Sequence, residues 1–247
     1  MFIPIVIHSP YFDVKHVVLY RQGALKLRHI ALVKLALLIS QPAYSEPTSI
    51  DVYDNKIGFD VVRDGERVGQ HVTTFSREES DLVVVSQMNM NITFLTIPVY
   101  SFDYKSIEKW SDGALSHLDV AVKDGSDQIK ISSLPNADRL TIKAPSGTYS
   151  IDSPIISTNH WNADVVRQGR VLNTLTGNIN QVKIWNRGEE WIPVNGGSIL
   201  ATRYDYSGEL KDTSVWYDAK GRWSRLEFKA RDGSTIEYIC NTCEREP

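Results

Sequence analysis

The feature that most constrains the fold is a turn dipeptide that recurs between segments of alternating apolar and polar residues. Asp-Gly occurs at 64–65, 112–113, 124–125 and 232–233, and Asn-Gly at 195–196 is a related pair. Both dipeptides tolerate positive φ at the two central positions of a tight hairpin turn. Each pair therefore predicts a β-hairpin, and together they predict an antiparallel β fold.

The segments between these turns alternate as strands do. Leu82, Val84 and Met88 share one face of an extended chain, and Gln87 and Asn89 share the other. One apolar and one polar face are typical of an antiparallel sheet that is covered on one side. We count about eleven strands, and a sheet of that width must curl because each strand adds twist. We predict an all-β fold with one short helix: a single strongly curved antiparallel meander forming a half-barrel or open barrel.

The concave side of such a sheet has to be filled by something apolar, either a helix or a ligand. The helix is expected between Ser157 and Gly169. Thr158 or Asn159 can cap its start, Val165 can face inward, and the glycine can end it. A helix this short fills at most part of the concavity.

The segment 25–45 has the composition of an export signal. Basic Lys26 and Arg28 precede an apolar run at 30–39, and the small residues of Ala43-Tyr44-Ser45 suit a signal peptidase. The run is about ten residues long against the ~20 that span a bilayer, so we do not expect an integral membrane protein. The alternative is a buried N-terminal helix.

We therefore divide the chain into two parts. Residues 1–45 are predicted to be an N-terminal extension plus a cleavable signal peptide, and residues 46–247 a single antiparallel β domain that is periplasmic or secreted. The part upstream of the signal suggests that translation starts later, near Val18 or Leu25.

The mature part carries 22 basic and 29 acidic side chains, a net charge of −7. A domain this acidic has no electrostatic reason to bind nucleic acid or anionic lipid surfaces.

Cys240 and Cys243, the two cysteines, lie near the end of the chain. On an extended strand, residues three apart are about 10 Å from each other, which is too far for a disulfide. A turn at Asn241-Thr242 would allow a local disulfide of the kind that oxidising compartments favour. Free thiols are an alternative, and a redox pair is a weaker one, because redox pairs usually begin a helix and this pair follows a strand.

The chain lacks the common catalytic motifs, including the Gly-x-Ser-x-Gly elbow, the phosphate loop, the dinucleotide fingerprint and His-Glu-x-x-His. His117 and Asp119 would share one face of a strand, but a single His-x-Asp is a weak start for a metal site. We predict no cofactor, no metal site and no assigned catalytic residue.

The aromatic residues are the best remaining lead to a binding site. All six tryptophans lie in the predicted mature part. Core packing is the first interpretation of these rings, and a pocket for an apolar or sugar-like ligand is the alternative. The segment Asn159-His160-Trp161-Asn162 places a ring, an imidazole and two amides at the start of the predicted helix. The candidate ligand-binding residues are Trp110, Asn159, His160, Trp161, Asn162 and Trp216.

Four segments resemble the signature segments of an uncharacterised family of exported proteobacterial proteins that carry a domain of unknown function. They are 110–115 (WSDGAL), 157–162 (STNHWN), 215–218 (VWYD) and 232–238 (DGSTIEY), and the similarity spans about Ile57 to Tyr238. The resemblance implies export and a fold similar to the half-barrel of periplasmic lipoprotein carriers, which hold acyl chains in the concavity. It implies no reaction.

Our leading hypothesis is a non-enzymatic periplasmic β-domain. It would bind an apolar or amphipathic, lipid-like ligand, or an envelope protein, in its concave face. One alternative is an enzyme of an unfamiliar class that uses the segment 159–162, with His160 as base and the two asparagines as polar support. A second alternative is a structural or assembly protein that acts through an exposed sheet edge.

Overall fold

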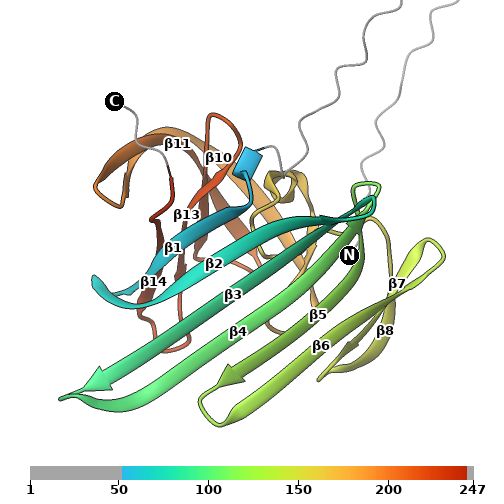
Figure 1. Cartoon of the computed structure of the whole chain (residues 1–247), viewed down its shortest axis with the longest axis horizontal. Helices are drawn as coiled ribbons and strands as arrows, with labels where there is room; N and C mark the ends of the chain where they lie inside the picture. Colours follow the sequence, from blue (N-terminus) through green and yellow to red (C-terminus); the bar gives the residue numbers. More distant parts are fainter. Residues whose placement is uncertain (1–51, 244–247) are drawn as a thin grey trace, which may run out of the picture. The chain divides into compact units, whose positions relative to one another are not determined.

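The structure, a computed structural model, describes residues 52–243, so the predicted signal peptide lies outside the described residues. Strands make up most of the described chain (Figure 1), and a short 3₁₀ helix, η1 (Ala163–Arg167), lies between β8 and β9. The strands are β1 (Lys56–Arg63), β2 (Glu66–Glu78), β3 (Asp81–Phe94), β4 (Ile97–Ser111), β5 (Ala114–Asp124), β6 (Asp127–Asn136), β7 (Arg139–Ala144), β8 (Gly147–Asp152), β9 (Arg170–Leu172), β10 (Ile179–Val194), β11 (Gly197–Gly208), β12 (Thr213–Asp218), β13 (Trp223–Lys229) and β14 (Thr235–Cys240).

All fourteen strands belong to one sheet with the order β8-β7-β6-β5-β4-β3-β2-β1-β14-β13-β12-β11-β10-β9. Every neighbouring pair is antiparallel, and β1 pairs with β14, so the first and last strands meet in the middle of the sheet. The predicted single curved antiparallel sheet is confirmed. The number of strands is higher than the predicted eleven because short strands, such as the three-residue β9, give too little alternation to be read from the sequence.

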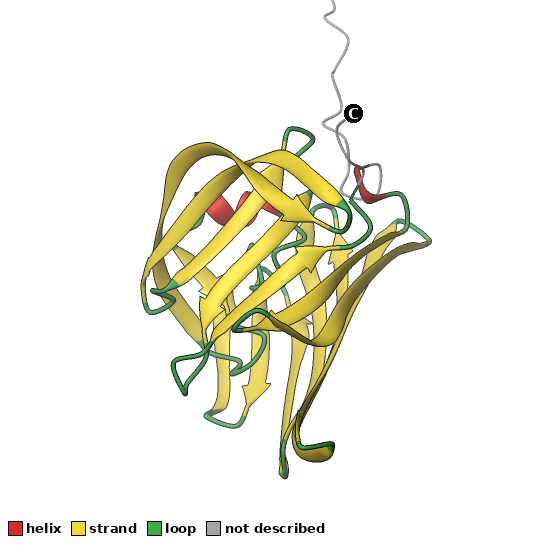
Figure 2. Cartoon of the chain, turned by 90° about the vertical axis from the view of Figure 1, so that its left-hand side faces the viewer, coloured by secondary structure: helices red, strands yellow, loops and turns green. Residues whose placement is uncertain are grey.

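The two outer strands of the sheet, β8 and β9, approach each other through loops and not through a shared ladder. Ser157 forms an isolated parallel bridge with Leu172, and the Tyr149 hydroxyl donates to the carbonyl of Gly177. A Cβ atom on Gly177 would lie 2.5 Å from that of Ala144, so only glycine allows this approach. The sheet therefore curls into a barrel-like shape without closing (Figure 2).

The concave face is filled by side chains from the strands and from the segment after β8. The rings of Phe59 and Trp223 lie 4.3 Å apart, and Trp161 packs edge-on against Trp110 at 5.1 Å. Val165 of η1 is fully buried in the same core. The predicted concave surface is thus the hydrophobic core of the domain.

The predicted helix is shorter and later than expected. Its N-cap is Asn162, whose side chain accepts a hydrogen bond from the backbone N–H of Asp164 at 3.0 Å. Thr158 and Asn159 do not cap it, because their side chains bond to other partners, described below for Asn159. Within residues 52–243, no helix has the length and apolar character needed to cross a membrane.

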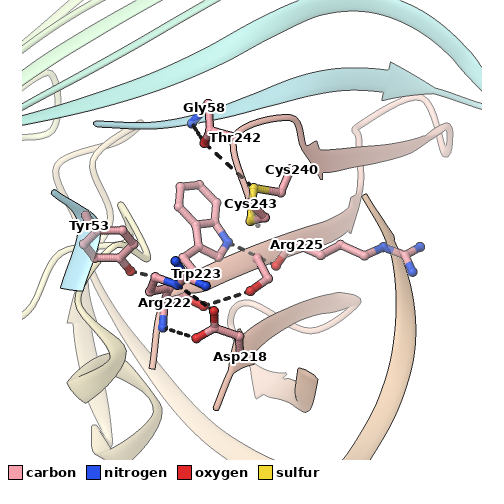
Figure 3. Close-up of a disulfide and its surroundings, with 10 residues drawn as sticks. Tyr53, Gly58, Asp218, Arg222, Trp223, Arg225, Cys240, Thr242 and Cys243 are labelled. Atoms are coloured by element: carbon pink, nitrogen blue, oxygen red, sulfur yellow. Dashed lines mark hydrogen bonds and ion pairs between the residues drawn. A yellow bond between two sulfur atoms is a disulfide. The ribbon is translucent and has the colours of Figure 1, made fainter. Parts of the chain in front are cut away.

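The chain turns back immediately after β14, where Cys240 and Cys243 form a disulfide with a Cα–Cα distance of 5.7 Å (Figure 3). The intervening turn is tied to β1. The backbone N–H of Gly58 donates to the Thr242 hydroxyl at 2.8 Å, and the N–H of Asn241 donates to the Gly58 carbonyl at 2.9 Å. The disulfide thus holds a turn that is itself fixed to the sheet.

Candidate functional site

Three of the predicted site residues meet at a carboxylate that the sequence had not singled out. Glu108 on β4 is 0 % exposed. Its Oε1 accepts from the Ser157 hydroxyl at 2.5 Å and from the side-chain amide of Asn159 at 2.7 Å. Its Oε2 accepts from the indole N–H groups of Trp110 at 3.0 Å and Trp161 at 2.8 Å. We call these five residues the Glu108 network.

The chemistry of the four donors favours an ionised Glu108. Indole N–H and amide NH₂ groups only donate, so three of the four partners cannot accept a hydrogen bond from a protonated carboxyl. Burial raises the pKa of Glu108, and the hydrogen bonds from these donors oppose that rise. No ion pair among residues 52–243 involves this carboxylate. The hydrogen-bond donors to this carboxylate are all neutral groups.

A second layer of hydrogen bonds fixes Asn159 to the same face of β4. Its Oδ1 accepts from the Tyr104 hydroxyl at 2.6 Å, and its amide nitrogen also donates to the Ser106 hydroxyl at 2.9 Å. Burial raises the pKa of Tyr104, which keeps the phenol protonated as a donor. Because the polar side-chain atoms of this cluster are hydrogen-bonded inside the core, the cluster holds the segment after β8 against the sheet.

His160 is buried beside this cluster, in the left-handed region at φ +57°. Its Nδ1 lies 3.4 Å from the Tyr206 hydroxyl, and its carbonyl accepts from the Tyr217 hydroxyl at 2.8 Å. Burial lowers its pKa to about 4, so the imidazole is neutral at neutral pH. The side chain packs in the interior, as its ring contact with Trp223 at 5.8 Å shows.

A second buried histidine, His71 on β2, was missed from the sequence. Its Nε2 lies 3.1 Å from the Thr73 hydroxyl, whereas its Nδ1 has no hydrogen-bond partner within residues 52–243. Burial lowers the pKa of His71 to about 3. The ring of Trp223 contacts both imidazoles. The alternation of β2, which places His71 on the apolar face with Phe75, was the available signal.

The other predicted site residues lie elsewhere. Asn162 caps η1, as described above. Trp216 on β12 donates its indole N–H to Glu190 at 2.6 Å and lies beneath the guanidinium groups of Arg203 and Arg225 at 5.2 and 4.7 Å. The six candidates therefore do not form one pocket: Trp110, Asn159 and Trp161 meet, and the rest occupy three separate environments.

His117 and Asp119 were the weak candidate for the start of a metal site. His117 and Asp119 do share the outer face of β5, where the imidazole and carboxylate lie 2.8 Å apart. In the part of the chain that the structure describes, no group of three histidine, cysteine, aspartate or glutamate side chains is placed to hold a metal ion. The pair is an ordinary surface interaction.

A hollow of about 520 Å³ lies on the outer face of the sheet, across β2 to β6, and sequence analysis missed it. We call it the outer hollow. Its polar lining consists of the following side chains: Gln70, Gln87, Asn89, Asp103, Lys105, Lys123, Gln128 and Lys130. The signal available in the sequence was the polar half of the strand alternation, which by itself indicates only a solvated face.

Strand register explains the shape of the outer hollow. Lys105 on β4 lies opposite Ala121 on β5, which in turn lies opposite Lys130 on β6. The alanine side chain leaves a gap between the two lysines, whose backbones are two strands or about 10 Å apart. Neither these lysines nor Lys123 forms an ion pair with any residue from 52 to 243. The outer hollow thus holds three unpaired ammonium groups and one carboxylate, that of Asp103.

Comparison with known proteins agrees with this fold. Residues 59–241 match the sequence profile of a family described as a domain of unknown function, DUF6134. No curated protein matches the chain. Among solved structures, the chain is similar to a beta-barrel-like protein of domain of unknown function DUF1849 from Brucella abortus, with a TM-score of 0.53 and 8 % identity over 77 % of this chain and 98 % of that one.

That structural likeness concerns the fold alone, because the sequence identity is so low. The predicted resemblance to an uncharacterised family with a barrel-like fold is confirmed. The family profile covers every described strand except the first three residues of β1. The chain belongs to the family of the domain of unknown function DUF6134.

Proposed function

We propose that this protein is an exported, non-enzymatic binding protein of the cell envelope. It would bind an amphipathic ligand by an anionic head group in the outer hollow. The observation that carries the proposal is the set of three lysines on one face of the sheet that form no ion pair with any residue from 52 to 243. The sequence placed a lipid-like ligand in the concave face, but side chains fill that space, so we move the binding surface to the outer face.

Export is supported by features at both ends of the chain. The segment 25–45 has the composition of a signal peptide. Cys240 and Cys243 form a disulfide, which persists in oxidising compartments such as the periplasm. N-terminal sequencing of mature protein tests the cleavage: we expect a start at Glu46, and recovery of Met1 would contradict export by this signal.

The chemistry of the outer hollow selects the head group. Ammonium groups with nearby amides suit a phosphate bearing hydroxyl groups, because charge-assisted bonds hold the phosphate and amides bond to the hydroxyls. Lys105 and Lys130 flank the gap over Ala121, where a phosphate would fit. Asp103, opposite Lys123, can accept from a hydroxyl.

A calorimetric titration tests this ligand class. We would titrate the protein with dihexanoyl phosphatidylglycerol, and use dihexanoyl phosphatidylcholine, whose zwitterionic head group has no net charge and no free hydroxyl, as the comparison. Lys105→Ala combined with Lys130→Ala should weaken binding about tenfold or more, because two charge-assisted contacts are lost. Lys109→Ala is the matched control, since Lys109 lies on the same face of β4 but pairs with Glu78 at 2.7 Å. Equal binding of both lipids, or no effect of the double variant, would contradict the proposal.

The enzyme alternative used the segment 159–162 as its site. Here Asn159 and Trp161 bond to Glu108, and His160 packs against Trp223. These contacts support a structural role for the segment: it fills and fixes the concave face. We assign no catalytic group to it.

The sheet-edge alternative is also less favoured by the contacts at the two outer strands. The Arg170 guanidinium at the start of β9 donates to the carbonyl of Asp152 at the end of β8, at 3.1 Å. The Tyr149 hydroxyl of β8 donates to Gly177 beyond β9. Since these edges already contact each other, we propose that recognition uses the outer face of the sheet.

A further inference from the structure

The hairpin formed by β3 and β4 differs in composition from the rest of the sheet. The sequence from Leu82 to Phe102 contains no aspartate, glutamate, lysine, arginine or histidine. At its end, Leu95 is 79 % exposed, Ile97 64 % and Val99 58 %. We call residues 95–99 the hairpin tip. Figure 1 shows the β3–β4 turn at one end of the sheet, where these two long strands end.

The backbone of this turn is strained. Leu95 and Thr96 have φ angles of +48° and +71°, the left-handed region that glycine and asparagine adopt at lower cost. The β1–β2 turn places Asp64-Gly65 at the equivalent positions. A β-branched threonine with positive φ is unfavourable and is typical of a position kept for function. The turn therefore has a strained backbone together with an exposed leucine at its apex.

The turns at the same end of the sheet as the hairpin tip carry charges of both signs. Arg231 lies 3.9 Å from Asp124, and Arg63 forms an ion pair with Asp232 at 2.7 Å. These contacts place the β1–β2, β5–β6 and β13–β14 turns side by side at the same end of the sheet as the hairpin tip. Apolar residues at the hairpin tip and paired charges on the neighbouring turns match the apolar-to-zwitterionic order of a bilayer surface.

We propose that the hairpin tip docks this protein on a lipid bilayer by inserting Leu95, Ile97 and Val99 at the boundary between head groups and acyl chains. A protein partner would be expected to meet the apolar tip with a rim of unpaired charges, whereas the charges named on the neighbouring turns pair with each other, Arg63 with Asp232 and Arg231 with Asp124. The charge-free hairpin can enter the interface without the cost of desolvating an ion. Docking would therefore be driven by apolar burial and not by attraction to anionic lipid.

Vesicle flotation with phosphatidylcholine alone tests the proposal. We expect the full chain to float with the vesicles at low and at high salt, since no charge attraction is needed. Leu95→Asp combined with Ile97→Asp should reduce the bound fraction about tenfold or more. Leu134→Asp is the matched control: Leu134 is 65 % exposed, but lies near the far end of β6, so binding should not change.

A second variant separates membrane docking from a general loss of structure. Leu95→Asn combined with Thr96→Gly relaxes the turn, so the protein should melt at a higher temperature and yet bind vesicles less. Lys105→Ala with Lys130→Ala should leave flotation unchanged. Ligand binding in the outer hollow and membrane docking through the hairpin tip are therefore tested separately, and either proposal can be wrong without the other. Absence of flotation, flotation that survives the double aspartate variant, or self-association that this variant abolishes would overturn the proposal.

Discussion

The two faces of β4 use polar residues in opposite ways. On the inner face, Glu108 accepts four hydrogen bonds and has no contact with solvent. On the outer face, Lys105 has no ion-pair partner within the described chain and lines the outer hollow. A buried polar group that is fully satisfied stabilises a unique arrangement of the core. An exposed one without a partner is available to a ligand, so the difference directs the search for function to the outer face.

The largest test of this contrast removes the acceptor at the centre of the inner face. Glu108→Ala leaves the hydroxyl, amide and two indole donors without their partner, so we expect a loss of about 4 kcal/mol in the free energy of unfolding, or failure to fold. Urea denaturation measures the loss. Glu66→Ala, at an exposed position on β2, is the control and should change stability by less than about 0.5 kcal/mol. A similar small effect for Glu108 would show that its network is not structural.

The second test uses the buried histidines. Burial lowers the pKa of His71 to about 3 and that of His160 to about 4, against an ordinary value of 6.5. Above pH 6.5 the stability from their neutral forms is fully present. Below it the unfolded chain binds protons that the folded chain does not, so stability falls as pH falls, by about 2 kcal/mol per histidine between pH 6.5 and 4.5.

His71→Phe should remove one histidine's share of that pH dependence. Urea denaturation at a series of pH values gives the slope, and comparison with the parent isolates His71 because Glu108 is present in both. His117→Gln on the outer face should leave the slope nearly unchanged. An unaltered slope in His71→Phe would show that this ring is not buried in its neutral form.

The sequence predicted the local part of this structure well. Dipeptides such as Asp64-Gly65 and Asp112-Gly113 specify their turns through their own backbone preferences, and the structure has hairpins at both. The Glu108 network depends on contacts across 49 to 53 residues of sequence, between β4 and the segment after β8. The spacing of Glu108 and Trp161 in the sequence does not predict that contact, because the contact follows from the curl of the whole sheet.

The outer features were missed for a different reason. Lys105 lies on the exposed side of the alternation of β4 and faces away from the core. Whether an outward lysine is paired, and which residue faces it on the next strand, depends on register, which here pairs Lys105 with the small side chain of Ala121. Register between long strands is set by all their contacts together and not by one motif.

The third test compares two turns of the sheet. Leu95→Asn with Thr96→Gly gives the β3–β4 turn the chemistry that suits positive φ, so the free energy of unfolding should rise by about 1 kcal/mol. Thermal and urea unfolding both measure it. A loss of stability would show that the hairpin tip is not strained in the folded protein.

The smallest expected effect on stability belongs to the outer face. Lys105→Ala with Lys130→Ala should change the free energy of unfolding by less than about 0.5 kcal/mol, because exposed, unpaired lysines contribute little to folding. Urea denaturation in the absence of lipid measures the change. A loss comparable to that of Glu108→Ala would remove the distinction between the two faces of β4.

The most direct measurement is an NMR titration of the protein with dihexanoyl phosphatidylglycerol, which reports the ligand's position residue by residue. We predict chemical-shift changes at Ala121 and at the flanking Lys105 and Lys130, with the indole N–H signals of Trp110 and Trp161 unmoved. Shifts of those two indole signals with Ala121 unchanged would place the ligand in the interior and contradict the assignment of binding to the outer face.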